Sequence, residues 1–166
     1  MIIGDHAFRS DGSSGQSCLF GVAEDEMLRR MMQAIDLKEE DVYVTNCIKC
    51  RPRPDMTPTA RHGRACLRLL REEMAALRPT LVCCMGPLPT SLLLGKADPL
   101  IRLRGRLFKR RIDGVGMTTI VPTFHPRFLL SHPEMKRAVW LDLQMIRRRL
   151  GERHPTPDTR KSAPGR

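Results

Sequence analysis

The sequence predicts an α/β fold with a mostly parallel sheet of four strands, and two observations lead to this prediction. Four short apolar runs alternate with segments whose apolar residues recur every three or four positions, as they do on one face of a helix. The length of 166 residues fits a single domain. The apolar runs, each short enough for a buried strand, are Ile2–Gly4, Val42–Cys47, Thr80–Met85 and Thr118–Phe124.

Helices are expected between these strands and after the last one. The second helix begins after Pro58, with Thr59 as its N-cap, and ends before Pro79. A short third helix follows Gly86, and the last helix runs from about Pro133 to about Leu150. The first helix is indicated by a stripe of apolar residues that consists of Met27, Leu28, Met31, Met32 and Ile35.

Composition and charge narrow the class of protein. Residues 1–150 are expected to form the folded domain. Residues 151–166 are rich in Pro, Thr, Ser and charge, which predicts a disordered basic tail. The net charge is +11, and the tail contributes only +2 of it, so the folded part itself is basic and suits a polyanion such as nucleic acid. No apolar stretch is long enough to span a membrane and no secretory signal is recognisable, so a cytoplasmic protein is expected.

Polar residues follow the apolar runs at the points where the strands should end. Asp5 follows the first run, Asn46 ends the second, and His125 follows the fourth. The carboxyl ends of parallel strands meet at one edge of the sheet, where α/β proteins bind their ligands. The three side chains would then line one cleft. Asp5 would supply a carboxylate that orients water, Asn46 an amide that donates and accepts hydrogen bonds, and His125 an imidazole that donates a hydrogen bond to a developing anion.

Two cysteines form a second constellation. Cys50 and Cys66 lie sixteen positions apart in a stretch rich in Arg and His, and the intervening chain is long enough to bring both thiolates to one metal centre. Two thiolates do not complete a site, because zinc and iron–sulfur centres usually take four ligands.

The ordered motifs resemble those of the uracil-DNA glycosylases, specifically the iron–sulfur branch known as family 4 or the thermophile type. The resemblance covers the chain from about Ile2 to Gly151. It implies a three-layer α/β/α sandwich, an enzyme that flips uracil out of DNA and hydrolyses its N-glycosidic bond, and a structural [4Fe-4S] cluster. The matching segments are VYVTNCIKCRP, FHPRFLL, VWLDL, FGVAEDEMLRRMMQAIDL, CMGPLPTSLLLG and Arg104-Gly105.

The resemblance also implies a role for each matched residue. His125 would donate to the O2 anion of the departing uracil, Asn46 would read the N3/O4 edge of the base, and Asp5 would position the attacking water. Gly4 and Phe20 would complete the base-binding site, with Phe20 stacking on the ring. DNA would be contacted by Arg51, Arg127, Phe128 and Leu129, the last three in a loop that enters the minor groove.

Cys50 and Cys66 match two of the four cluster ligands of this family, whose other two form a C-x-x-C before the first strand. Because the chain keeps two ligands and Met1 opens the first strand, we expect a sequence truncated at its start; decay of the cluster site is the alternative.

The function expected from the resemblance is uracil excision from DNA by a monomer. Two alternatives stay open, because this chain has Gly4-Asp5-His6-Ala7-Phe8 where the family has GEAPG. The chain could be a glycosylase-like DNA-binding protein without catalysis, or a glycosylase for another deaminated base.

Overall fold

The computed structural model describes residues 1–7, 19–50, 52–53 and 56–152. Its sheet has the strand order β2-β1-β3-β5-β4, in which neighbouring strands are parallel except β4 and β5. The strands are β1 (Ile2–Gly4), β2 (Val44–Asn46), β3 (Leu81–Met85), β4 (Phe108–Ile112) and β5 (Gly116–Thr123). The helices are α1 (Val22–Gln33), α2 (Ala60–Leu77), α3 (Pro87–Leu94), α4 (Leu100–Leu103), α5 (Pro126–Ser131) and α6 (Lys136–Gly151), with 3₁₀ turns at Glu39–Asp41 and Pro133–Met135.

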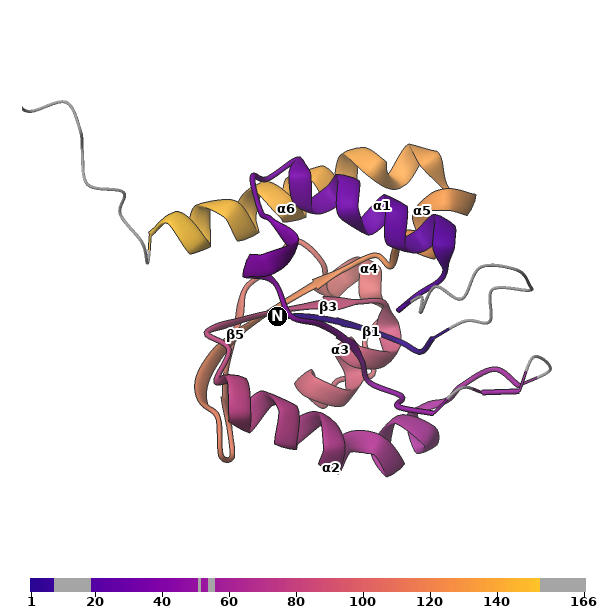
Figure 1. Ribbon diagram of the computed structural model, residues 1–166, viewed down its shortest axis with the longest axis vertical. Helices are drawn as coiled ribbons and strands as arrows, with labels where there is room; N and C mark the ends of the chain where they lie inside the picture. Colours follow the sequence, from indigo (N-terminus) through magenta and orange to yellow (C-terminus); the bar gives the residue numbers. More distant parts are fainter. Residues whose placement is uncertain (8–18, 51, 54–55, 153–166) are drawn as a thin grey trace, which may run out of the picture.

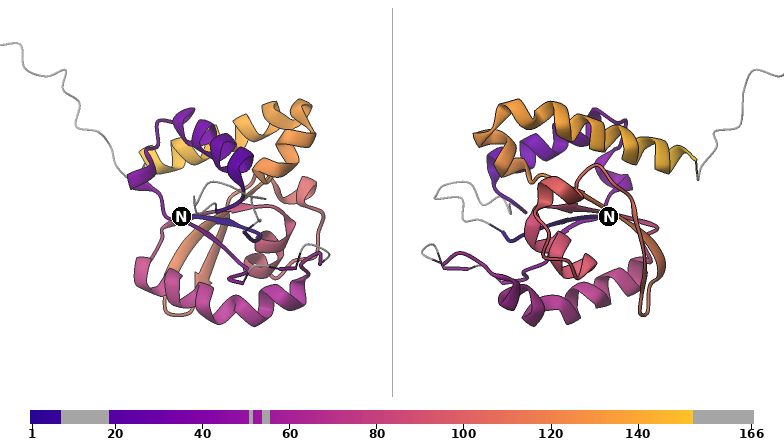
Figure 2. Two further views of the ribbon diagram at one scale, coloured as in Figure 1. Left: turned by 45° about the vertical axis from the view of Figure 1, so that its right-hand side comes forward. Right: turned by 180° about the vertical axis from the view of Figure 1, so that it is seen from behind.

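The helices cover both faces of the sheet. Figures 1 and 2 show α1, α5 and α6 on one face and α2 on the other, so the expected three-layer arrangement is confirmed. Strand β1 lies between β2 and β3, and the chain leaves it first toward β2 through α1 and then reaches β3 through α2. The strand order therefore reverses at β1, and in doubly wound sheets ligands bind at such a point, beyond the carboxyl ends of the strands.

Two apolar cores lie on the two faces of the sheet, and the alternation of side chains along each strand assigns residues to them. Ile2 packs in the core beneath α1, α5 and α6, whereas Ile3 packs in the core beneath α2 and α3. In β3, Cys83 belongs to the first core, and Val82 and Cys84 belong to the second. Both faces of the central strands are thus covered, which explains why they read as continuous apolar runs.

The sequence pattern missed one strand, so the expected count of four is corrected to five. β4 forms an antiparallel hairpin with β5 at the edge of the sheet. Its sequence, FKRRI, exposes Lys109 and Arg111 and buries Phe108, because an edge strand needs only one apolar face and charged residues there discourage pairing with other chains. A strand with three consecutive charged residues does not read as an apolar run.

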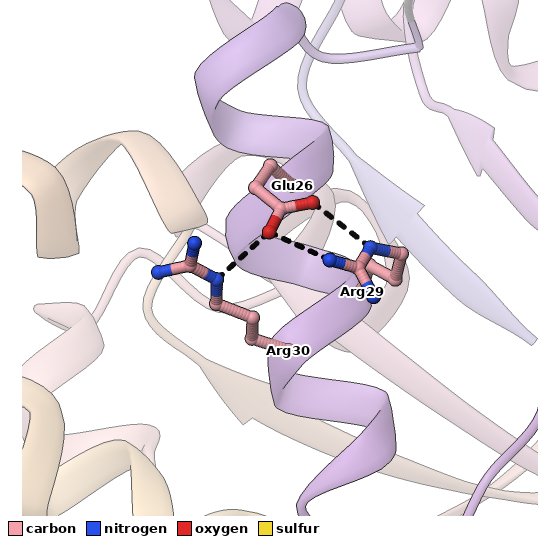
Figure 3. A network of polar contacts seen from close by, with 3 residues as sticks. All are labelled: Glu26, Arg29 and Arg30. Carbon is pink, nitrogen blue, oxygen red and sulfur yellow. Dashed lines mark hydrogen bonds and ion pairs between the residues drawn. The ribbon is translucent and has the colours of Figure 1, made fainter.

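The helical predictions agree with the structure apart from α4, which was not expected, and α5. Leu28, Met31 and Met32 of the methionine stripe are buried on α1, and Ile35 is buried just beyond it. The opposite side of α1 is polar: Glu26 accepts hydrogen bonds from Arg29 and Arg30, and these bonds lower its pKa (Figure 3). Such exposed pairs add little stability, so α1 is held by its buried face.

Two further expectations concern the chain after His125. The segment FHPRFLL, expected as a loop, instead forms the short helix α5, because Pro126 starts a helix easily and the His125 side chain caps it. The expected tail, 151–166, lies outside the described residues except for Gly151 and Glu152. No helix in the described ranges is both long and apolar enough to cross a membrane.

Candidate active site

The carboxyl ends of the parallel strands bring the predicted site residues together. Gly4 ends β1 and pairs in register with Asn46, which ends β2. Asp5 follows β1, and its carboxylate lies against Gly86, the residue after β3: a Cβ atom on Gly86 would be 2.9 Å from Asp5 Oδ1. Gly86 also has a φ of +106°, so this close approach depends on glycine in two ways.

Phe20 lies between the ends of β1 and β5. Its side chain is completely buried, and its ring centroid is 4.7 Å from that of His125. A Cβ atom on Gly4 would collide with the Phe20 ring and would lie 2.8 Å from Asn46 Oδ1. Gly4 therefore permits the aromatic ring and the amide to meet over the end of β1, and the structure brings Gly4, Phe20, Asn46 and His125 together.

Hydrogen bonds fix the orientation of the Asn46 amide and the His125 ring. Asn46 Nδ2 donates to the carbonyl oxygen of Leu19 at 2.7 Å, so its Oδ1 is left as an acceptor. The backbone N–H of Arg127 donates to His125 Nδ1 at 3.2 Å. The Nδ1 atom must then be unprotonated, and the neutral ring carries its proton on Nε2. The site thus presents one acceptor and one N–H donor in defined positions.

Three buried polar atoms of the site have no hydrogen-bond partner among the described residues. They are Asp5 Oδ1, Asn46 Oδ1 and His125 Nε2. Each unsatisfied buried group costs about 1–3 kcal/mol, so folded proteins rarely collect several at one place unless a ligand satisfies them. The three atoms belong to the three residues that the sequence predicts for catalysis.

Burial changes the protonation of the two titratable groups in opposite directions. Desolvation raises the pKa of Asp5 from 3.8 to about 7, although the nearby Arg127 guanidinium opposes the rise. Desolvation lowers the pKa of His125 to about 3, and the positive charge of Arg127 adds to that effect. His125 is therefore neutral near pH 7, whereas Asp5 is divided between its acidic and ionised forms.

A buried network supports the end of β5 from behind. Thr123 Oγ1 donates to Asp142 Oδ2 at 2.7 Å, and Arg104 forms a bidentate pair with the same carboxylate at 3.1 and 2.7 Å. The Asp142 side chain is fully buried. The carbonyl of Thr123 also accepts from the backbone N–H of Gly86 at 2.9 Å, so the ends of β3 and β5 are tied together two residues before His125. Sequence reasoning missed Asp142, because a single acidic residue in a helix reads as a surface residue.

The residues predicted to bind DNA have varied environments. Arg51 lies outside the described residues. Phe128 is stacked between the rings of Phe124 and His132, with centroids 4.6 and 4.1 Å apart. Leu129 is only 1% exposed and belongs to the core, so the expectation that it enters the DNA groove does not fit its position; α5 turns Leu130 to solvent instead, with 41% exposure. A side chain at Leu129 that left the core would forfeit the free energy of its burial.

Arg127 is the fourth predicted DNA-binding residue, and the structure ties it into the protein. Its guanidinium donates to Glu24 on α1 and to the carbonyl oxygen of Phe20. Glu24 is a second residue that sequence reasoning missed, since it lies 103 positions from its partner and no local pattern marks it.

The described cysteines do not fit a cluster with four thiolate ligands. Cys50 is exposed and Cys66 is half-buried, and the described residues contain no group of three or more His, Cys, Asp or Glu side chains placed to hold a metal ion. Cys47 donates its thiol hydrogen bond to the backbone oxygen of Asp5, and burial raises the pKa of Cys47 and Cys83 to about 12, which disfavours thiolates. No step of the chemistry proposed below is therefore assigned to a cluster.

The fold and the site define a class: an α/β protein with a doubly wound sheet, whose ligand site lies at the reversal of strand order and is lined by an aromatic ring, an amide, an imidazole and a carboxyl group. Comparison with known proteins identifies the family. Residues 1–144 match the model of the uracil DNA glycosylase superfamily, and the chain belongs to this superfamily.

Curated relatives agree with this assignment. The type-4 uracil-DNA glycosylase of Archaeoglobus fulgidus is 26% identical over 160 residues, which cover 94% of this chain and 79% of the relative. The type-4 enzyme of Pyrobaculum aerophilum is 28% identical over 150 residues, covering 88% and 75%. The type-4 enzyme of Thermotoga maritima is 31% identical over 121 residues, covering 71% and 61%.

Proposed function

We propose that this protein is a uracil-DNA glycosylase, which hydrolyses the bond between uracil and deoxyribose in DNA. The observation that carries the proposal is the set of three unsatisfied buried atoms at the end of the sheet, on Asp5, Asn46 and His125. Their donor and acceptor characters match uracil and its leaving anion. Membership of the glycosylase superfamily supports the same activity.

The base would be recognised by Asn46 and Phe20. Asn46 Oδ1 accepts a hydrogen bond, and uracil offers an N3–H donor, whereas cytosine has an acceptor at N3. The orientation of the amide is not free to reverse, because its Nδ2 is bound to the Leu19 carbonyl oxygen. Phe20 offers an apolar aromatic surface against which a flipped pyrimidine would pack.

His125 would stabilise the leaving group. When the bond from the sugar C1′ to uracil N1 breaks, its electron pair passes to the base and is delocalised onto O2. The neutral ring donates through Nε2–H to this developing anion. With a pKa of about 3, His125 stabilises the charge by a hydrogen bond and keeps its proton at neutral pH.

Asp5 would direct water to the sugar. The water oxygen forms the new bond to C1′, and its proton passes to the Asp5 carboxylate. This role requires the ionised form, so the pKa of about 7 predicts that the rate rises with pH through neutrality. Asp5 is shorter by one methylene than the Glu of the GEAPG turn, so its carboxylate reaches less far toward the water. The alternative function is therefore a protein that binds uracil-containing DNA without turnover.

DNA would be held by the basic surface of the protein. The net charge of +11 attracts the phosphate backbone, and the exposed Leu130 on α5 is the apolar side chain placed to fill the space left by a flipped base.

The test is release of uracil from oligonucleotides that differ only in one base. We expect free uracil, and an abasic site in the DNA, from the uracil substrate and no release from the matched cytosine substrate, whose N3 is an acceptor. His125→Ala should abolish release, while His132→Ala, which removes an exposed imidazole at the far end of α5, should preserve most of it. Tight binding of uracil-containing DNA with no uracil released would favour the non-catalytic alternative.

A further inference from the structure

Arg127 joins the two sides of the candidate active site. Its Nε donates to Glu24 Oε1 at 2.9 Å and its Nη2 donates to the carbonyl oxygen of Phe20 at 3.0 Å. Its own backbone N–H donates to His125 Nδ1 at 3.2 Å. Arg127 therefore fixes both the backbone at Phe20 and the ring of His125. The rings of Phe20 and His125 contact each other.

The Arg127 guanidinium already donates hydrogen bonds to groups of the protein. A guanidinium presents its donors in a rigid planar fork, and here two of its nitrogens serve two different acceptors, one of which is a carboxylate. The Glu24 side chain is only 16% exposed, so this ion pair is better shielded from solvent than a surface pair. The guanidinium cannot turn its Nε–Nη2 edge, the edge best suited to a bidentate phosphate contact, toward DNA without leaving these two acceptors.

The positive charge of Arg127 also acts on the titratable groups of the site. It lowers the pKa of Asp5 against the larger effect of burial, and it contributes to the lowered pKa of His6 and His125. Glu24, on α1, partly offsets that charge. Among the described groups, Arg127 acts on Asp5, and Asp5 in turn acts on Cys47. His6 and His125 face the same Arg127 charge, which Glu24 pairs.

We propose that Arg127 is a positioning residue of the glycosylase site, which holds Phe20 against His125 and keeps its positive charge beside Asp5, and that it does not bind a DNA phosphate. This inference rests on the proposed function. It gives a different role to a residue for which the family resemblance implies a DNA contact.

Three substitutions separate the hydrogen bonds that the Arg127 guanidinium makes to Glu24 and Phe20 from its positive charge. Arg127→Gln removes both, Arg127→Lys keeps the charge but loses the planar fork, and Glu24→Gln keeps the arginine but removes the opposing charge. Arg148→Gln is the matched control, because Arg148 is an exposed arginine far from the candidate active site. It lies near the end of α6, and Leu150 in the same turn lines a cavity at the amino-terminal edge of the sheet, opposite the site.

Two readouts test the proposal: the pH profile of single-turnover uracil excision, and the salt dependence of binding to uracil-free DNA. We expect Arg127→Gln to lower the rate by roughly 10–100-fold through misplaced groups, and to move the acid limb of the profile to higher pH. Glu24→Gln should move that limb to lower pH, and Arg127→Lys should slow excision with the limb in place. The salt slope of DNA binding should be unchanged in Arg127→Gln.

A phosphate contact gives a different result. Loss of one such contact reduces the slope of log K against log salt by about one, and this outcome in Arg127→Gln would overturn the proposal. An acid limb that stays in place in both Arg127→Gln and Glu24→Gln would also overturn it. NMR titration of the Asp5 carboxyl in the same variants must show the same opposite shifts, and because this measurement needs no turnover, it distinguishes a wrong role for Arg127 from a protein that is not a glycosylase.

Discussion

Replacement of Asp5 by Asn should stabilise the fold while it removes activity, and the gain should depend on pH. Well below pH 3.8 the Asp5 carboxyl is protonated in the folded and the unfolded chain alike, so the substitution changes little. As the pH rises from about 4 to about 7, the unfolded carboxyl ionises but the buried one resists, and the folded state loses stability. The amide of the Asp5→Asn variant does not ionise, so this variant escapes the loss.

The size of the effect follows from the two pKa values. The ordinary value of 3.8 and the folded value of about 7 differ by about three pH units, and each corresponds to about 1.4 kcal/mol. The full difference would be about 4 kcal/mol; because the Asp5 residue is only partly buried, we expect roughly 2–4 kcal/mol at pH 8. Excision should fall by at least ~10²-fold, the usual contribution of a positioned general base.

Urea unfolding at pH 4, 6 and 8 measures the stability gain, with Asp98→Asn as the control because Asp98 is exposed. The gain from Asp5→Asn should grow between pH 4 and 7 and then level off, while the control stays flat. A gain that does not change with pH, or a variant less stable than the parent at pH 8, would refute the reasoning.

Three further substitutions probe the support of the site. Asp142→Ala should lower the free energy of unfolding by about 3–5 kcal/mol, because it leaves the Arg104 guanidinium without its buried partner; thermal unfolding measures the loss. Gly4→Ala should displace Phe20 and abolish excision with the fold retained, since the new Cβ would collide with the ring, and circular dichroism beside the uracil assay would show both effects. Leu130→Ala should slow excision from duplex DNA more than from single-stranded DNA, and equal slowing of both would argue against a wedge.

The α/β class could be predicted because periodicity and strand burial are local properties of the sequence. Ile2–Gly4 and Leu81–Met85 are fully covered strands and therefore continuous apolar runs. β4 was not predicted because only one face of an edge strand needs to be apolar. Its other face carries charged residues, and such a sequence resembles a loop.

The positions of Asp5, Asn46 and His125 could be predicted because each ends a strand or follows one within two residues, and strand ends converge in a parallel sheet. The supporting contacts could not, because they join residues far apart in the chain. Arg127 and Glu24 are 103 positions apart, and Arg104 and Asp142 are 38 apart. Their charges alone give no indication of a partner, and the family resemblance therefore implied a DNA contact for Arg127, the arginine that follows the His-Pro pair.

Single-turnover excision of uracil by the parent chain and by its His125→Ala and Asn46→Ala variants tests the central claim most directly. We predict that the parent releases uracil and that each substitution alone lowers the rate by at least ~10²-fold, because each removes a hydrogen bond made to the departing base. Uracil release that survives both substitutions, or a parent chain that releases none, would contradict this prediction.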